Sequence, residues 1–174
     1  VTHGENVVEG GASLEYGLNL LMKADVLIGH NILKFDIPAI QKVYPWFKLK
    51  DGVVIHDTLI MARLIYPEIK EMDFGLAAQG KLPKKLIGRY SLESFGYRLG
   101  EYKGDYTGGW ETWSQEMQDY CEQDIEVTTA LYHKLLERKE KHGFSDYCIE
   151  LEHRVASIIF RQEQNGFGFD SEKA

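Results

Sequence analysis

The chain has 174 residues, a formal net charge of −7 and 44% hydrophobic residues. This length allows one domain plus a fragment of another, at roughly 100–200 residues per domain, and the hydrophobic fraction argues against a fully disordered chain. No apolar run reaches the roughly 18 residues of a membrane helix. The negative charge argues against a generally basic nucleic-acid-binding surface. The two cysteines, Cys121 and Cys148, form no CxxC pair, which favours a reduced intracellular setting.

Strand and helix patterns alternate in the first part of the chain. Apolar residues recur at helical spacing from Leu14, and residues 26–28 then predict a short buried strand before a tight turn at Gly29. Pro38 is tolerated in the first turn of a helix, so a helix is expected there, ending at Pro45.

A second strand is expected at residues 53–55, and Asp57-Thr58 is typical of the start of a capped helix. Strand alternating with helix predicts an α/β fold. Residues 70–88 break the pattern with Gly, Lys and Pro and are expected to form a connecting segment. A short capped helix is expected over residues 91–99.

The last part of the chain is predicted to be mainly helical. A long helical pattern, or two abutting ones, covers residues 114–139, after a loop rich in glycine and aromatic residues. Another helical pattern begins near Ile149 and ends at Asn165-Gly166, which is typical of a helix stop.

Asp124 is the most informative candidate residue. It is the one formal charge on a stripe of the long helix that is otherwise mostly apolar. A carboxylate there is costly unless it is paired or binds a metal. The alternative is a structural Asp bonded to Arg63, to Arg98 or to backbone N–H groups. Tyr120 is one turn earlier on the same face, where it could lie beside a metal-bound water or be a core aromatic.

Two further aspartates follow predicted strands. Asp36 precedes Pro38 at the start of a helix, so it is either a helix cap or a metal ligand at the strand ends, where open α/β sheets bind ligands. Asp57 allows the same two interpretations, but the helix pattern that follows it directly favours the cap. The dipeptide His56-Asp57 alone is weak evidence for a metal site.

Two sets of residues could contact nucleic acid, although packing or a solvated surface explains them equally well. Aromatic residues beside a lysine could stack on unpaired bases: Tyr102, Lys103, Tyr106, Trp110 and Trp113. Basic residues of the connecting segment could contact phosphates: Lys81, Lys84, Lys85 and Arg89. Neither cysteine has a neighbouring motif of a catalytic nucleophile.

Two motifs resemble those of a known family. His30-Asn31 followed by Lys34-Phe35-Asp36, and the run from Tyr120 to Asp124, are similar to the second and third motifs of the 3′–5′ proofreading exonuclease domain of family A DNA polymerases. The likeness is strongest to the replicative polymerases of short-tailed phages. It also covers Asp57-Thr58-Leu59, Gly80-Lys81-Leu82-Pro83, Gly96-Tyr97-Arg98-Leu99-Gly100, and a tail that resembles the start of the polymerase module, Leu151-Glu152-His153-Arg154 and Asn165-Gly166-Phe167.

This resemblance implies a ribonuclease-H-like mixed sheet flanked by helices, with a final helix leading into the polymerase module. It implies that Asp36 and Asp124 are metal ligands, that Tyr120 orients the attacking water, and that Asn31 and Lys34 contact nucleic acid. The implied cofactors are two Mg²⁺ or Mn²⁺ ions, which hydrolyse the terminal phosphodiester. The implied partners are the single-stranded 3′ end of DNA and the polymerase module of the same chain, with no membrane. A processivity factor is a further candidate partner that the sequence does not identify.

The first motif of the family, an Asp-x-Glu on the opening strand, has no match before Asp36. Glu5, Glu9 and Glu15 lack its spacing and its apolar surroundings. We therefore expect a partial exonuclease domain over residues 1–147 that lacks its first strands, followed by the start of the polymerase module over residues 148–174. Such a chain is expected to be inactive alone.

Two other interpretations stay open. A degenerate domain could serve as a scaffold that binds single-stranded DNA without cleaving it, or the chain could be a stand-alone nuclease of the same fold. The retained Asp36, Tyr120 and Asp124 argue against the scaffold, and the polymerase-like tail argues against the stand-alone enzyme. Cysteine usage and the resemblance together predict a cytoplasmic protein of a bacterial or phage-infected cell.

Overall fold

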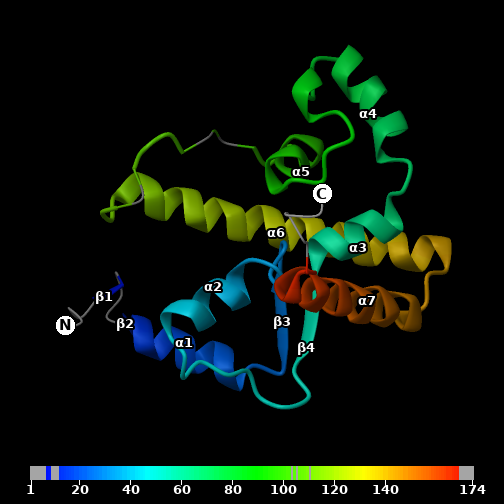
Figure 1. Cartoon of the computed structure of the whole chain (residues 1–174). Coiled ribbons are helices and arrows are strands. Elements are labelled where there is room, and N and C mark those ends of the chain that lie inside the picture. Colours follow the sequence, from blue (N-terminus) through cyan, green and yellow to red (C-terminus); the bar gives the residue numbers. More distant parts are fainter. Residues whose placement is uncertain (1–6, 9–11, 103, 105, 110, 169–174) are drawn as a thin grey trace.

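A computed structural model describes residues 7–8, 12–102, 104, 106–109 and 111–168 (Figure 1). Glu5 and Glu9, considered above for the first motif, lie outside the described residues, as do Lys103 and Trp110 of the aromatic loop. The elements in chain order are β1 (Val7–Val8), β2 (Ala12–Ser13), α1 (Leu14–Lys23), β3 (Val26–Gly29), α2 (Asp36–Val43), β4 (Val54–Asp57), α3 (Thr58–Ile65), α4 (Ile69–Ala78), η1 (Lys84–Leu86), α5 (Leu92–Leu99), α6 (Gln115–His142) and α7 (Asp146–Asn165).

Strands β3 and β4 form a parallel pair, in register from Val26 opposite Val54 to Gly29 opposite Asp57. The connection between them runs through α2, because parallel strands need a crossover. The prediction of an α/β fold is therefore confirmed. The single mixed sheet is not seen among the described residues, where the antiparallel pair β1–β2 forms a separate sheet. β1 and β2 have two residues each, and they pair with each other rather than with β3 or β4.

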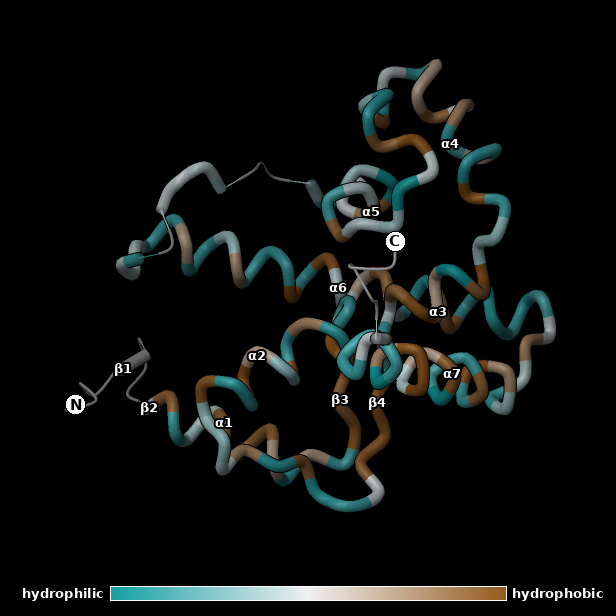
Figure 2. The backbone as a smooth tube through the Cα atoms, in the orientation of Figure 1, coloured by the Kyte–Doolittle hydropathy of each residue, from teal (hydrophilic) through white to brown (hydrophobic). Residues whose placement is uncertain are grey.

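Strands β3 and β4 consist mainly of apolar residues, and a tight turn follows β3. Both strands are hydrophobic along most of their length (Figure 2), which is typical of parallel strands covered by helices. Their carboxyl ends point towards α6 (Figure 1). At Gly29 the chain turns so tightly that an added Cβ would lie 2.8 Å from the Cβ of Ile32, so no larger residue fits there.

The hydrophobic core lies between α3, α5, α6 and the start of α7. Helix α3 packs against both α6 and α7, and α5 packs against α6. The buried members of this core are Met61, Ala62, Ile65, Tyr66, Ile69, Phe95, Val127, Leu131, Leu135 and Ile149. Helix α6 is thus the element on which the others are assembled.

Helix α4 is absent from the sequence-based expectation, which treated residues 70–88 as a connecting segment. The structure has a helix over Ile69–Ala78 and a short 3₁₀ helix at Lys84–Leu86. Ile69 and Asp73, one turn apart, are both buried. The segment is also rich in strong helix formers such as Glu71, Met72 and Leu76, so intrinsic propensity and tertiary contacts both favour this helix.

The other predicted helices are present. Helices α5, α6 and α7 begin after the capping serines Ser91, Ser114 and Ser145, as expected for residues whose side chains accept hydrogen bonds from free N–H groups. Helix α7 ends before Gly166, as predicted. In the described part of the chain, no helix is long and apolar enough to cross a membrane.

Candidate functional site

The segment from Asn31 to Asp36 connects β3 to α2 and is held in place by Asp57. Oδ1 of Asp57 accepts a hydrogen bond from the N–H of Asn31 at 2.9 Å, and Oδ2 accepts one from the N–H of Leu33 at 3.2 Å. Asn31 has a φ of +64°, a conformation that asparagine adopts more readily than most residues. The turn after β3 is therefore built around a buried carboxylate.

Asp57 is also the cap of α3, as the sequence predicts. Its Oδ1 accepts from the N–H of Leu59 at 3.0 Å, and the residue is only 1% exposed. A single side chain thus serves three backbone donors from two elements. Its role in holding the 31–33 turn has no sequence signal, because the partners are 24 and 26 residues away.

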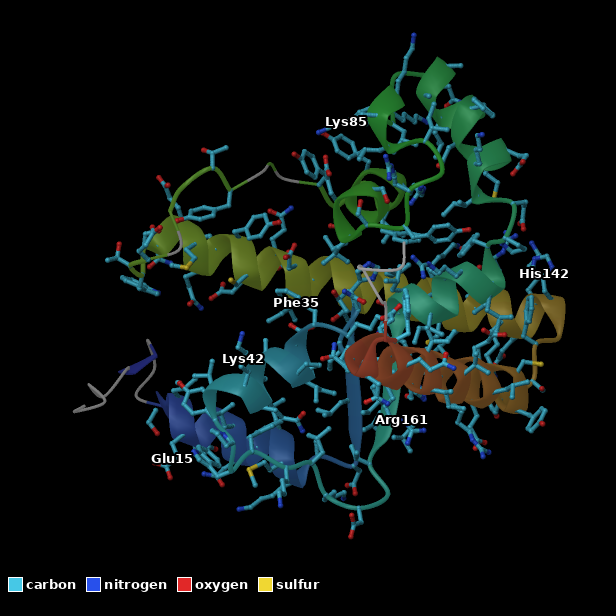
Figure 3. All side chains as sticks on the ribbon, in the orientation of Figure 1. Glu15, Phe35, Lys42, Lys85, His142 and Arg161 are labelled. Carbon is cyan, nitrogen blue, oxygen red and sulfur yellow. The ribbon has the colours of Figure 1, made fainter. Side chains whose placement is uncertain are left out.

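Asp36 is the first residue of α2, and the helix cap is Phe35, whose side chain makes no capping bond. The interpretation of Asp36 as a cap is therefore wrong. Phe35 is 67% exposed and projects from the start of the helix (Figure 3). Asp36 is exposed as a residue, but partial burial of its carboxyl raises the pKa above its ordinary value. A hydrogen bond from its own N–H opposes this shift, and the nearby charge of Asp57 adds to it.

Tyr120 and Asp124 lie one turn apart on α6 and are both half-buried. Val127, Leu131 and Leu135 follow along the same side of the helix at exposures of 3%, 1% and 0%. Asp124 and Tyr120 line a hollow of about 20 Å³ against α5, together with Glu93, Gly96 and Tyr102. The predicted carboxylate at the end of an apolar stripe is therefore present.

Burial raises the pKa of Asp124 above its ordinary value. The structural alternative was an ion pair with an arginine, but Arg98 binds Asp73 instead and Arg63 is exposed. Among the described residues, Asp124 has no ion-pair partner. Its charge also contributes, after burial, to the raised pKa of the Cys121 thiol. Asp124 is thus a partly desolvated carboxylate with no ion-pair partner in the part of the chain that the structure describes.

A raised folded-state pKa means that folding favours the protonated form of Asp124. Its ionisation therefore costs stability, and that cost develops as the pH rises from the unfolded pKa through the folded one. We expect Asp124→Asn to raise the free energy of unfolding of the metal-free chain at pH 7, by up to about 1 kcal/mol after solvent screening. The gain is expected to disappear at a pH below the unfolded pKa. Chemical denaturation at both pH values measures it.

Asp119→Asn is the matched control, because Asp119 is exposed on the same helix. It removes the same charge without relieving burial. An equal gain from both variants would mean that net charge, rather than the environment of Asp124, sets the effect.

Two of the predicted site residues offer carboxylates from different elements. Asp36 comes from α2 and Asp124 from α6, and both have the oxygen ligands that Mg²⁺ prefers. Within the described ranges, no group of three or more His, Cys, Asp or Glu side chains could hold a metal ion. Metal binding by Asp36 and Asp124 therefore stays a prediction.

Helix α7 makes two contacts that the sequence did not predict, one with Asp57 at the end of β4 and one with Lys34 of the candidate segment. Nε2 of His153 accepts a hydrogen bond from the N–H of Asp57 at 2.8 Å, while its Nδ1 lies 2.7 Å from the carbonyl oxygen of Ile149. This pairing requires the neutral tautomer with the proton on Nδ1. Nearer the end of the helix, both carboxylate oxygens of Glu163 bind Nζ of Lys34, at 2.9 and 2.7 Å.

His30, at the end of β3, links three elements. Its Nδ1 lies 2.9 Å from the hydroxyl of Thr58 and its Nε2 3.0 Å from the carbonyl oxygen of Tyr90. Burial lowers the pKa of His30, and the charge of Asp57 opposes this shift. A neutral imidazole satisfies both contacts, so His30 has a structural role beside the candidate segment.

Two tyrosines of the aromatic loop lie against other aromatic rings, whereas residues 107–109 and 111–113 are exposed. Tyr102 stacks on Tyr97 with ring centroids 4.0 Å apart, and Tyr106 lies 6.0 Å from Tyr120. Trp113 is 64% exposed. In the basic segment, Nζ of Lys85 lies 3.2 Å from a carboxylate oxygen of Glu93. A base-stacking role therefore stays a prediction for Trp113 rather than for the two tyrosines.

A cavity of about 810 Å³ lies between β4, α6 and α7, lined by residues such as Val54, His56, Leu136, Ile149 and Ile158. None of the predicted site residues lines it, but Leu33, next to Lys34, does. The cavity therefore borders the segment before Asp36 without including the predicted metal ligands.

The chain is similar in sequence to phage enzymes named DNA-directed DNA polymerases. The chain is 35% identical over 190 aligned residues to the polymerase of Escherichia phage T7, and equally to that of Enterobacteria phage T3. Each match covers 86% of this chain and 26% of the relative, so the chain spans about a quarter of their length. No protein-family profile matches the chain. The resemblance to phage DNA polymerases is therefore confirmed.

Proposed function

We propose that this chain is part of the 3′–5′ proofreading exonuclease domain of a phage-type, family A DNA polymerase. The reaction is hydrolysis of the terminal phosphodiester at a single-stranded 3′ end of DNA. The similarity to two phage DNA polymerases over 86% of the chain supports the parent enzyme. The motifs around Asp36 and Asp124 support the nuclease.

The observation that carries this proposal is the environment of Asp124. Its carboxylate is half-buried, burial raises its pKa, and no cation among the described residues compensates its charge. Folding tolerates such a cost where a bound ion repays it. Tyr120, one turn earlier, gives the site a hydroxyl group on the same helix face.

Each residue has a distinct role in this proposal. Asp36 and Asp124 bind metal through their carboxylates, and Tyr120 orients the attacking water. Asn31 and Lys34 contact the DNA strand beside Asp36. Two Mg²⁺ or Mn²⁺ ions, when bound, supply an activated water and stabilise the leaving 3′ oxygen. The polymerase module, beginning with α7 near residue 148, is the covalent partner, and a processivity factor is a further candidate partner.

The coding sequence upstream of Val1 tests this proposal directly. We expect an Asp-x-Glu within an apolar strand in about the preceding hundred codons, the scale of a missing sheet. The 174-residue chain alone is then expected to release no nucleotides from a single-stranded 3′ end in Mg²⁺, because it lacks two ligands. An unrelated upstream segment would contradict this assignment. Robust Mg²⁺-dependent release by the isolated chain that Asp124→Ala abolishes would contradict the expectation that the chain is inactive alone.

A second candidate function is a degenerate scaffold that binds single-stranded DNA without cleaving it. The absence of a three-ligand metal cluster among the described residues favours it. Mn²⁺ titration with thermal melting, on a chain that includes the upstream strands, separates the two functions. A metal-dependent rise in melting temperature supports the nuclease, and an unchanged one supports the scaffold.

A further inference from the structure

The ion pair between Lys34 and Glu163 joins two parts of the chain that are 129 residues apart. Lys34 is in the segment that carries Asp36, and Glu163 is in the last turn of α7. Both oxygens of Glu163 bind the same Nζ, at 2.9 and 2.7 Å. The side chains are 38% and 52% exposed, so solvent and ligands can reach this pair.

The carboxylate of Glu163 hinders the binding of a phosphate to Lys34. It occupies two of the three N–H donors of the ammonium group and neutralises its charge. A DNA phosphate that approaches the same ammonium meets the negative charge of Glu163. Phosphate contacts depend on unneutralised cations, so the two anions compete for one cation.

We propose that Glu163 masks Lys34, so that this lysine binds a DNA phosphate only when the end of α7 moves away from it. The contact is a built-in competitor of single-strand binding at the candidate nuclease segment. The inference rests on the proposed function, because it takes Lys34 as a DNA contact.

The contacts that His153 and Glu163 make from α7 differ in burial, and this difference permits the end of the helix to move. His153 binds the N–H of buried Asp57, and it lies ten residues before Glu163, which is about 15 Å along the helix. The exposed ion pair is worth little by itself, with a coupling energy of at most about 1 kcal/mol. The end of α7 can therefore release Lys34 while His153 keeps the helix on the sheet.

Binding of a fluorescent oligothymidylate to the full 174-residue chain tests the proposal. At low salt, we expect Glu163→Gln to tighten binding about two- to five-fold, the range set by an exposed ion pair. An increase in affinity distinguishes masking from a merely structural contact, because loss of a structural contact would leave the affinity unchanged or lower it. We expect the gain to shrink as salt screens the charges.

Two further variants complete the design. Glu152→Gln removes the same charge from an exposed position of the same helix, eleven residues from Glu163, and it controls for net charge. Lys34→Gln is expected to weaken binding and to abolish the effect of Glu163→Gln. Circular dichroism checks that each variant is folded.

The outcomes separate the two proposals. If Lys34→Gln weakens binding but Glu163→Gln tightens it no more than Glu152→Gln does, masking is wrong and Lys34 is still a DNA contact. A gain from Glu163→Gln that persists beside Lys34→Gln also overturns masking. If Lys34→Gln does not weaken the binding of the Glu163→Gln variant, the assigned role of Lys34 fails, and the masking inference fails with it.

Discussion

Asp73→Ala is expected to lower the free energy of unfolding by about 3–5 kcal/mol, as is typical when one partner of a buried ion pair is removed. The side chains of Asp73 and Arg98 are 1% and 10% exposed. Nε and Nη2 of Arg98 donate to the two carboxylate oxygens at 2.8 and 2.7 Å, and the N–H of Gly88 donates to Oδ2 at 2.8 Å. Urea denaturation monitored by circular dichroism measures the loss.

The size of this effect follows from the charge left behind. Arg98 also donates to the carbonyl oxygen of Arg89 and to the hydroxyl of Ser94, so the guanidinium cannot leave without breaking several bonds. Asp73→Leu combined with Arg98→Met is expected to cost less than the sum of the two single variants. Glu137→Gln, at an exposed pair with Lys134, is the control and is expected to cost less than about 0.5 kcal/mol. A loss below about 1 kcal/mol for Asp73→Ala would contradict the structural role of this pair.

Asp57→Ala is expected to cost about 2–4 kcal/mol. The loss of a helix cap accounts for about 1 kcal/mol, and the partly buried N–H groups of Asn31 and Leu33 lose their acceptor as well. Asp57→Asn keeps one acceptor oxygen, so we expect about half of the loss. The same denaturation experiment measures both variants.

Amide hydrogen exchange locates the effect of Asp57→Ala. We expect the amides of Asn31 and Leu33 to exchange faster, while the amides in the middle of α6 keep their relative protection. Asp51→Asn, in an exposed turn, is the control. Unchanged exchange at Asn31 and Leu33 would show that Asp57 only caps α3 and does not hold the candidate segment.

Local patterns predicted the elements that depend on nearby residues. The strand before Gly29, the cap at Asp57 and the end of α7 at Gly166 each have their signal within a few positions. Helix α4 was not predicted, because the glycine, lysine and proline residues within 70–88 obscured the helix-forming residues of Ile69–Ala78. The contact of Asp73 with Arg98, 25 residues later, has no local signal. The absence of one mixed sheet among the described residues also follows from pairing, which composition does not specify.

The residues of the candidate site also divide into those with a local sequence signal and those without one. Tyr120 and Asp124 could be placed on one face from helical spacing alone. Asp36 was placed correctly at the start of α2. Its assignment as a metal ligand came from the family resemblance, because an aspartate at a helix start usually has a structural role. The contacts of His153 and Glu163 could not be predicted, because they join the last helix to a turn about 100 or more residues earlier.

Helix α7 gives the fold a direct connection between its ends. It packs on α3 and holds the backbone of Asp57, whose carboxylate fixes the turn before Asp36. The Lys34–Glu163 pair is the most exposed part of this connection.

The most direct test of the central claim is an exonuclease assay on the parent protein, including the residues encoded before Val1. We expect Mg²⁺-dependent release of nucleotides from a single-stranded 3′ end, reduced at least about a hundredfold by Asp124→Asn, since loss of a metal ligand costs more than loss of its supporting hydrogen bonds. Glu122→Gln, exposed on the same helix, is expected to keep full activity. Equal release by the parent and by Asp124→Asn, or no release by either, would contradict a metal-dependent nuclease at Asp124.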